Sequence, residues 1–328
     1  MTRSDGNDDR AEAASREASV SATKKRAGFA AIIGAPNAGK STLVNRLVGA
    51  KVSIVTQKVQ TTRFPVKGVA MAGEAQIVLV DTPGIFKPRR RLDRAMVRAA
   101  HTHASDADVV VHLVDAHAEE STKPGDKRSA EDAEMITESL VAAGGKTILV
   151  LNKIDLVKRD HLLALSQRLY ETGAYDEVFM VSAHNGSGVD DLKAALAARM
   201  PESEWLYPAD QTADLPVRLL AAEITREKLY LRVHEELPYN LTVETTAFDE
   251  KKDGSARVEQ TIYVERESQR PIILGKGGAT IKWIGEAARK DLGEILDRTI
   301  HLFLQVKVRE GWQEERAFYT GVGLDFDV

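Results

Sequence analysis

The sequence predicts an α/β protein in which a P-loop domain with a mainly parallel sheet precedes a smaller α+β domain of order αββααβ. Three observations predict this fold. A glycine-rich loop at residues 34–41 lies between a short apolar strand and a helical segment. Further apolar segments then alternate with helical ones, which is typical of a parallel sheet covered on both faces. After prolines at 201, 208 and 216 the order of elements changes, which indicates a second domain.

Length and composition set the limits for this fold. A chain of 328 residues with 43% apolar content can bury two separate cores. The formal net charge of -4 excludes neither nucleic acid nor protein as a partner, because a local basic face can exist within a nearly neutral total. The absence of cysteine excludes disulfides and thiolate chemistry and favours a cytoplasmic location. No apolar run reaches the roughly 18 residues that span a bilayer.

The domain boundaries follow from changes in composition. Residues 1–27 carry almost no large apolar side chains, so we expect a disordered tail that cannot offset the entropy of ordering. We place the first domain at 28–203, an extended linker at 204–216, and the second domain, with its C-terminal tail, at 217–328.

Apolar periodicity predicts the individual elements. In the first domain we expect strands at 29–33, 76–80, 109–114, 147–151 and 178–181. Helical periodicity follows the first strand through Leu43, Leu47 and Val48, and predicts further helices at 132–143, 161–172 and 189–199. In the second domain we expect a helix at 217–235, strands at 241–248 and 257–265 joined by Asp253-Gly254, a helix at 279–292 and a strand at 299–308.

The glycine-rich loop is the most specific motif. It matches an eight-residue phosphate loop and reads Gly34, Ala35, Pro36, Asn37, Ala38, Gly39, Lys40 and Ser41. Its glycines let backbone N–H groups converge on phosphates, and the helix that follows adds its positive N-terminal end. Lys40 would reach the β and γ phosphates, and Ser41 would ligate Mg²⁺. The loop predicts a site for a nucleoside triphosphate.

A second motif stands at the same edge of the sheet and reads Asp81, Thr82, Pro83 and Gly84. We expect Asp81 to hold Mg²⁺, through water, and Gly84 to offer its N–H to the γ phosphate. Between the first helix and Asp81 lie two threonines, one of which should close on Mg²⁺, and we favour Thr62 over Thr61. The predicted metal ligands are therefore Ser41, Thr62 and Asp81.

The base is predicted by the residues that follow the strand at 147–151, which are Asn152, Lys153, Ile154 and Asp155. Guanine presents N1–H and N2–H donors that the Asp155 carboxylate can accept, whereas adenine offers no such pair. Asn152 would tie the loop together, and the Lys153 stem would lie along the base. Ser182 and Ala183, after the last strand, are placed to offer backbone N–H groups to guanine O6. These residues favour GTP over ATP.

The hydrolysis rate is predicted to be low. Ile85 follows Gly84, at a position where many such enzymes carry a glutamine that orients the attacking water. Isoleucine cannot orient water, so we expect slow intrinsic hydrolysis, with Asn37 helping to seat a potassium ion. The predicted catalytic residues are Asn37, Lys40, Thr62 and Gly84.

The second domain carries a Gly-x-x-Gly turn before a helix, which is the arrangement of a KH domain. Glycines there allow a sugar–phosphate backbone to approach closely, and basic residues surround the turn, with Glu286 as the single acid. The predicted RNA-binding residues are Arg270, Gly275, Lys276, Gly277, Gly278, Lys282, Arg289 and Lys290. The alternative is a glycine-capped helix with a solvated basic face. We expect Trp283 and Trp312 to be packing residues.

Together these motifs resemble the bacterial Era family, in which a Ras-like GTPase domain is joined to a C-terminal type II KH domain. The resemblance runs from about residue 29 to the end and rests on Gly-x-Pro-Asn-x-Gly-Lys-Ser, Gln-Thr-Thr-Arg, Asp-Thr-Pro-Gly, Asn-Lys-Ile-Asp and the run at 274–282. It implies a GTPase that acts in 30S ribosomal subunit assembly, with the KH domain on the 3′ end of 16S ribosomal RNA. It also implies a peripheral contact with the inner membrane face. We expect a monomer.

Two rival functions stay open at this point. The second domain could bind a protein partner instead of RNA. The first domain could be an ATPase or a nucleotide-independent scaffold, which a test of base preference would distinguish from a GTPase.

Overall fold

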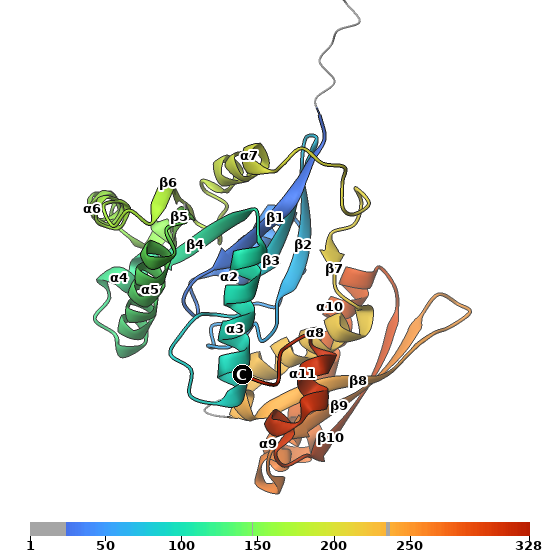
Figure 1. The fold of residues 1–328 in the computed structure, drawn as a ribbon. Coiled ribbons are helices and arrows are strands. Elements are labelled where there is room, and N and C mark those ends of the chain that lie inside the picture. Colours follow the sequence, from blue (N-terminus) through green and yellow to red (C-terminus); the bar gives the residue numbers. More distant parts are fainter. Residues whose placement is uncertain (1–23, 146, 234–236) are drawn as a thin grey trace, which may run out of the picture.

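The computed structural model describes residues 24–145, 147–233 and 237–328. Figure 1 shows a larger domain built on a seven-stranded sheet and, below it, a smaller domain built on three strands. The predicted fold class is therefore confirmed. No helix in the described ranges is long and apolar enough to cross a membrane.

The sheet of the larger domain has the strand order β6-β5-β4-β1-β3-β2-β7. Its strands are β1 (Arg26–Ile33), β2 (Val66–Ala72), β3 (Ala75–Asp81), β4 (Val109–Asp115), β5 (Thr147–Asn152), β6 (Tyr175–Met180) and β7 (Ala213–Asp214). Five of them pair in parallel, whereas β2 runs antiparallel to β3 and β7 antiparallel to β2. Because parallel strands end at one edge, the loops after β1, β3 and β5 meet there.

Helices cover both faces of this sheet. They are α2 (Lys40–Val48), α3 (Arg91–Asp106), α4 (Ala116–Glu120), α5 (Pro124–Ala143), α6 (Arg159–Tyr170) and α7 (Val189–Arg199), with a 3-10 turn at Ile154–Leu156. Successive strand residues point to opposite faces. Ile32 accordingly packs in the core formed with α2 and α7, and Ile33 packs in the core formed with α3 and α5. Leu149 and Leu151 pack against α6 on the second face.

The smaller domain follows the order αββααβ, as predicted. Its elements are α8 (Val217–Arg232), β8 (Leu241–Glu250), β9 (Ala256–Val264), α9 (Arg270–Leu274), α10 (Ala279–Leu296) and β10 (Ile300–Val308), followed by α11 (Arg316–Gly321). Four 3-10 turns lie at Leu237–Asn240, Glu267–Gln269, Lys276–Gly278 and Trp312–Glu314. In the sheet, β9 is central, β10 is parallel to it and β8 antiparallel. The core lies between this sheet and helices α8 and α10.

The expected linker at 204–216 is wrong for Ala213 and Asp214, which form β7 and pair with β2. The reason is that the chain after α7 returns along the open edge of the sheet. Gln76 on β3 fixes this path, because its side-chain oxygen accepts the backbone N–H groups of Leu206 and Tyr207 at 2.8 and 2.9 Å. Backbone pairing thus extends the sheet where composition alone indicates a free segment.

The expected disordered tail is wrong for Arg26 and Ala27, which begin β1 and pair with β3. The strand end is held by its backbone pairing with β3 and by the burial of Ala27, which composition alone does not reveal. Residues 1–23 of the expected tail lie outside the described residues. So do 234 and 235 of the helix expected at 217–235, whose described part ends at Arg232.

Candidate functional site

The phosphate loop joins β1 to α2 and needs glycine at two positions. Gly34 and Gly39 have φ values of 153° and 100°. A Cβ atom at Gly34 would lie 2.3 Å from the backbone oxygen of Leu113, and one at Gly39 would lie 2.3 Å from Nδ2 of Asn152. Both positions combine positive φ with close neighbours, which only glycine tolerates. The loop therefore presents backbone, and not side chains, at the start of α2.

Lys40 lies inside the phosphate loop. Its side chain is only 6% exposed, and Nζ donates hydrogen bonds to the backbone oxygens of Gly34 and Ala35 at 3.0 and 2.8 Å. Burial lowers the pKa of Lys40 to about 8, and the charge of Asp81 partly opposes this shift. The two carbonyl oxygens are neutral partners for the buried ammonium group of Lys40. An anion that displaced them would supply the negative charge that these oxygens lack.

Three side-chain oxygens meet beside the phosphate loop. Ser41 Oγ lies 2.7 Å from Asp81 Oδ2 and 2.9 Å from Thr62 Oγ1, and Thr62 Oγ1 lies 3.3 Å from Asp81 Oδ2. Thr61 instead bonds within its own loop, to Lys58 O at 2.7 Å. The geometry thus brings together the residues predicted as metal ligands, and it brings Thr62 there in place of Thr61.

The carboxylate of Asp81 is fully buried and incompletely paired. Oδ1 is one of the buried oxygens in the described part of the chain without a hydrogen-bond partner. Burial raises the pKa of Asp81, while the hydrogen bond from Ser41 and the charge of Lys40 lower it. An unpaired buried carboxylate oxygen next to two hydroxyls suits a hard cation such as Mg²⁺, which prefers oxygen ligands. The described residues contain no cluster of three His, Cys, Asp or Glu side chains that could hold a metal.

Gly84 contacts the phosphate loop directly. A Cβ atom there would lie 2.9–3.0 Å from three atoms of Pro36. The next residue, Ile85, donates its N–H to Gly34 O at 3.1 Å and buries its side chain in the core with Ala100 and Ile136. The loop after β3 therefore rests on the phosphate loop, and the side chain of Ile85 is buried in the core.

The guanine-reading loop is joined to the phosphate loop by one buried amide. Asn152 Nδ2 donates to Ala38 O at 2.8 Å, and Asn152 Oδ1 accepts the N–H of Ala183 at 3.0 Å. Lys153 has a positive φ of 64°, and its Nζ pairs with Asp115 at 2.5 Å. Asp155 is exposed at this edge of the sheet, so its carboxylate is accessible to a ligand.

The predicted N–H donors for guanine O6 are already used within the protein. Ser182 donates its N–H to Ser187 O at 2.9 Å, and Ala183 donates to the side chain of Asn152. In this arrangement Ser182 and Ala183 support the loop instead of facing a ligand, which corrects the expected role of their N–H groups. The sequence alone cannot reveal this, because any backbone N–H looks available until its partner is known.

The glycine turn of the second domain lies between α9 and α10. Gly275, Gly277 and Gly278 all have positive φ values, of 74°, 59° and 79°. A Cβ atom at Gly275 would lie 2.2 Å from Thr280 Oγ1, whereas Gly277 and Gly278 face open space. The turn is therefore tight on its inner side and bare on its outer side, as close approach of a sugar–phosphate backbone requires.

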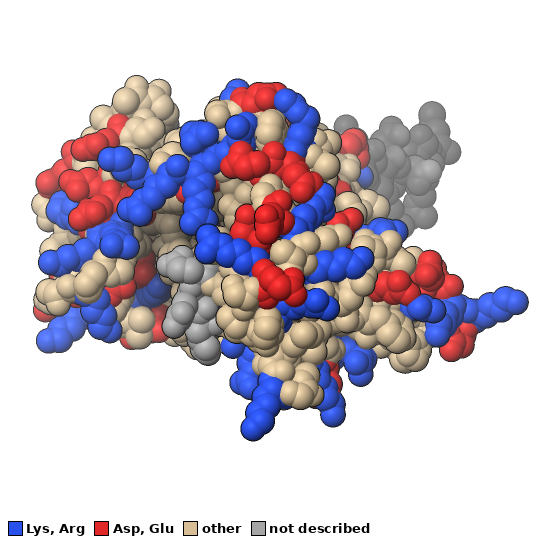
Figure 2. All heavy atoms as spheres, turned by 90° about the horizontal axis from the view of Figure 1, so that it is seen from below, with Lys and Arg blue, Asp and Glu red and all other residues tan. Residues whose placement is uncertain are grey.

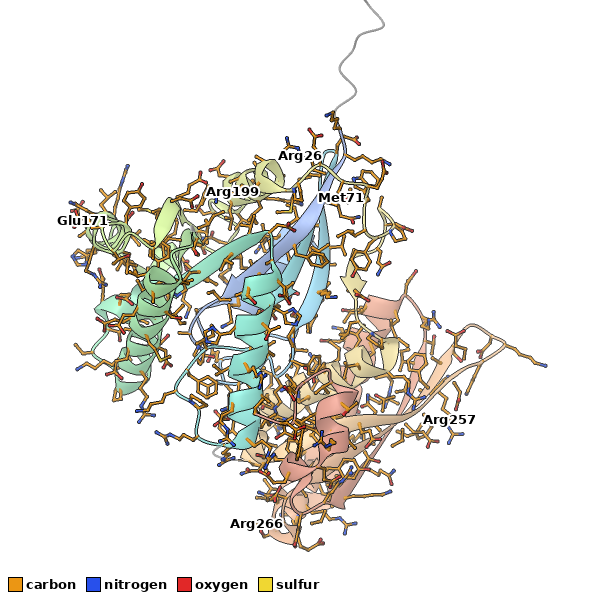
Figure 3. The ribbon with its side chains drawn as sticks, viewed as in Figure 1. Arg26, Met71, Glu171, Arg199, Arg257 and Arg266 are labelled. Atoms are coloured by element: carbon orange, nitrogen blue, oxygen red, sulfur yellow. The ribbon has the colours of Figure 1, made fainter. Side chains whose placement is uncertain are left out.

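The basic residues around this turn are more mixed with acids than predicted. Arg270 pairs with Glu267 at 3.3 Å, and Lys290 lies 3.9 Å from Glu294, so Glu286 is not the only acid nearby. Lys276, Lys282 and Arg289 are exposed. Figure 3 shows Arg266, just before α9, at the end of this domain far from the larger sheet. Figure 2, seen from below, shows basic and acidic side chains interspersed on that side.

The two tryptophans differ from each other. Trp312 is 1% exposed and packs in the interior, as expected. Trp283 is 39% exposed, with the Arg232 guanidinium 5.5 Å from its ring, so the expectation of a packing role was wrong for Trp283.

One group of residues beside the site could not be predicted from sequence patterns. Arg63 follows Thr62 directly, and its guanidinium is buried in the second domain. Arg226, on α8 of that domain, donates to Thr61 O at 2.5 Å. Arginine is exposed in most contexts, so only the packing of the two domains reveals this contact.

Comparison with known proteins matches both parts of the chain. The family model described as 50S ribosome-binding GTPase matches residues 29–153, and the KH domain model matches residues 236–313. GTPase Era of Caulobacter vibrioides is 68% identical over 311 residues, which cover 93% of this chain and 98% of that protein. GTPase Era of Maricaulis maris is 61% identical over 314 residues, which cover 94% and 100%.

Two solved structures are similar over nearly the same length. A variant of Aquifex aeolicus Era bound to GDP.AlF4- has a TM-score of 0.82 and 36% identity, covering 91% of this chain and 99% of that one. Era in complex with MgGDPNP and nucleotides 1506-1542 of 16S ribosomal RNA gives the same TM-score, identity and coverage. Because relatives at this identity span almost all of the chain, the protein belongs to the Era family of GTPases and is a GTP-hydrolysing enzyme.

Proposed function

We propose that this protein is a Mg²⁺-dependent GTP switch whose KH domain binds the 3′ end of 16S ribosomal RNA during assembly of the 30S subunit. The observation that carries the proposal is the meeting of Ser41, Thr62 and Asp81 oxygens beside Lys40, in a chain that also presents a bare Gly-x-x-Gly turn. The solved complex of Era with MgGDPNP and 16S nucleotides supports it, since this chain aligns with 99% of that protein.

Different residues of the larger domain bind different parts of the nucleotide and its Mg²⁺. Backbone N–H groups of the phosphate loop and of the start of α2 bind the phosphates, and Lys40 neutralises the β and γ charges. Ser41, Thr62 and Asp81 would hold Mg²⁺, which supplies charge compensation on the phosphate oxygens when bound. Thr82 fixes the loop after β3 by donating to Ile32 O at 2.7 Å, and Pro83 and Gly84 follow it. Gly84 offers its N–H to the γ phosphate.

Asp155 selects guanine in this proposal. Asp155→Asn replaces an acceptor of two hydrogen bonds by a group that can also donate, so xanthine, whose C2 carbonyl accepts, becomes the better base. We expect the preference for GTP over xanthosine triphosphate to reverse, measured by competition against a fluorescent nucleotide. Asp160→Asn, an exposed acid at the start of α6, is the matched control and should leave the preference unchanged. An unaltered preference in the Asp155 variant would remove the case for guanine.

Slow hydrolysis and a potassium ion belong to the same proposal. Ile85 is buried and cannot orient water. Asn37 has a positive φ of 62° and donates its side-chain N–H to Gln57 O at 3.2 Å, and in this proposal its amide oxygen helps to bind the cation. We expect turnover to be higher in potassium than in sodium, and Asn37→Ala to abolish that difference. Equal turnover in the two salts would exclude the potassium site.

The RNA-binding role is tested at the glycine turn. Lys276→Asp combined with Gly277→Asp places two negative charges where the RNA backbone approaches, and should abolish binding of a 16S 3′-end oligonucleotide. GTP hydrolysis should not change, because α9, which leads into the turn, lies at the end of the KH domain away from the larger sheet (Figure 1). Lys251→Asp with Lys252→Asp, in the exposed β8–β9 turn, controls for net charge. RNA affinity that persists in the first variant would favour the rival reading, a protein partner.

The proposal also covers the domain boundaries, the oligomeric state and the location of the protein. We place the GTPase domain at 28–203, allowing for the added pairing of Arg26 and of β7, and the KH domain from 217 onwards. We infer a cytoplasmic monomer whose contact with the inner membrane face is peripheral. Sedimentation of the purified protein with and without ribosomal subunits and inner-membrane vesicles tests these three points separately.

A further inference from the structure

The Arg63 guanidinium is enclosed by the KH domain. Nη1 donates to Leu241 O at 2.8 Å, and Nη2 donates to Tyr230 OH at 3.0 Å and to Pro238 O at 3.2 Å. The rings of Tyr230 and Trp312 lie 5.9 and 5.5 Å from it. The side chain is only 2% exposed. A cation belonging to the GTPase domain is therefore held by carbonyls and aromatic rings of the other domain.

Thr62 lies between two residues that the KH domain holds. On one side Arg63 is enclosed as described. On the other, Arg226 on α8 donates to Thr61 O at 2.5 Å, and the same Arg226 is paired with Glu223. Both neighbours of Thr62 are thus held by the KH domain, and the hydroxyl of Thr62 faces Ser41 and Asp81. The placement of this hydroxyl depends on the KH domain.

The rest of the segment before Thr62 is attached to helices α8 and α10 of the KH domain. Lys51 pairs with Glu227 at 2.7 Å and with Asp291 at 2.9 Å, and Val55 donates its N–H to Glu227 Oε1 at 2.9 Å. Lys58 donates to the backbone oxygens of Tyr230 and Val233 at the end of α8. Residues 51–63 are therefore tied to the KH domain at several points, in the region where this domain meets the lower edge of the larger sheet (Figure 1).

We propose that Arg63 is a positioning residue through which the KH domain places Thr62 at the Mg²⁺ site, so that KH docking and binding of the γ phosphate stabilise each other. This inference rests on the proposed role of Thr62 as a metal ligand. A buried guanidinium cannot leave its carbonyl partners partway without leaving buried groups unpaired, so the contact has two discrete states, made or broken. Coupling of this kind is reciprocal, because each event favours the state that the other requires.

The test separates the triphosphate state from the diphosphate state. In the proposed role, Thr62 contributes to Mg²⁺ binding in the triphosphate state and not in the diphosphate state. In the full-length protein with saturating Mg²⁺, Arg63→Met should weaken binding of GDPNP about tenfold or more, a change equivalent to losing one well-made charged contact, and leave GDP binding within about twofold. Arg63→Lys keeps the charge but loses the planar guanidinium that donates to three acceptors. Its GDPNP affinity should lie between those of the wild type and Arg63→Met. The readout is competition against a fluorescent GDP analogue.

Two further variants keep the inference testable if Arg63→Met fails to fold. Tyr230→Phe changes a residue of the KH domain and removes only the hydroxyl that accepts from Arg63. It should lower the ratio of GDPNP affinity to GDP affinity about twofold to fivefold. Arg94→Met is the control, because Arg94 also crosses the domain interface, to Val328 O at 3.3 Å, but away from Thr62. Its affinity ratio should match the wild type.

The outcomes distinguish the two claims. If Thr62→Ala leaves the GDPNP to GDP ratio unchanged, the proposed metal role of Thr62 is wrong. If Thr62→Ala lowers the ratio but both Tyr230→Phe and a folded Arg63→Met leave it unchanged, the metal role stands and the positioning role of Arg63 is overturned. An equal loss in Arg94→Met would show general loosening of the interface, and would also overturn it.

Discussion

Asn152 and Ala38 are joined by a 2.8 Å hydrogen bond although 114 residues separate them. The bond runs from the side-chain amide of the guanine loop to the backbone of the phosphate loop, and the same amide also accepts from Ala183. One buried side chain thus holds the base-reading and phosphate-binding loops in register. Preorganised loops bind a ligand more tightly because less entropy is lost on binding.

Asn152→Ala should weaken GTP and GDP to the same extent, because both nucleotides need the two loops in register. It should also lower the free energy of unfolding by about 1–3 kcal/mol, since Ala38 O and Ala183 N–H lose their buried partner. Competition binding and urea denaturation measure the two effects. Asn185→Ala, in the turn after β6, is the matched control. Loss of affinity without loss of stability would show that Asn152 acts on the nucleotide and not between the loops.

Gly84→Ala should disturb the phosphate loop from the side of β3. The new methyl group would lie 2.9–3.0 Å from Pro36, including two backbone atoms that cannot move away cheaply. Overpacking of this kind costs about 1–3 kcal/mol, which would appear as lower stability and slower GTP hydrolysis. Gly125→Ala is the control, because the space around Gly125 is open. Unchanged stability and turnover in the Gly84 variant would mean that the two loops separate readily.

Nucleotide affinity should fall as the pH rises above 8. The pKa of Lys40 is lowered to about 8 by burial, and a bound phosphate would raise it again by its negative charge. Above pH 8 binding therefore requires uptake of a proton, and affinity for GDP should drop by up to about tenfold per pH unit. Below pH 7 Lys40 is charged and the dependence should vanish.

Isothermal titration with GDP between pH 6.5 and 9.5 measures this dependence. Lys40→Met, which cannot titrate, should bind weakly and show no such fall. A wild-type affinity that stays constant up to pH 9.5 would contradict the lowered pKa.

Phe326 should stabilise the contact between the end of the KH domain and α3. Its ring lies 4.3 Å from the Arg91 guanidinium and 4.7 Å from that of Arg316, and meets Tyr319 edge to face. Phe326→Ala should lower the free energy of unfolding by about 1–3 kcal/mol, which is less than for a fully buried phenylalanine. Phe303→Ala is the control, since Phe303 is 54% exposed. Equal effects in the two variants would show that this contact adds no stability.

Local patterns determined the chemistry of this protein. The phosphate loop, the guanine-reading loop and the Gly-x-x-Gly turn are each short runs whose function depends on residue type and on a neighbouring strand or helix, and both are visible in the sequence. The hairpin of β2 and β3 also has a local basis, because Gly73 in its turn has a φ of 58°, which favours glycine. The sequence holds no such signal for strand β7, because two residues are too few to show an apolar alternation.

Only the tertiary structure decided which groups meet. Thr62 faces Ser41, whereas Thr61 bonds to Lys58 O within its own loop. Two adjacent threonines do not reveal in the sequence which of them faces the site. The N–H groups of Ser182 and Ala183 are used internally, which depends on partners distant in sequence. Arg63 is buried because a second domain supplies carbonyls and rings around it. Burial of a charge is decided by what surrounds it, and the surroundings exist only after folding.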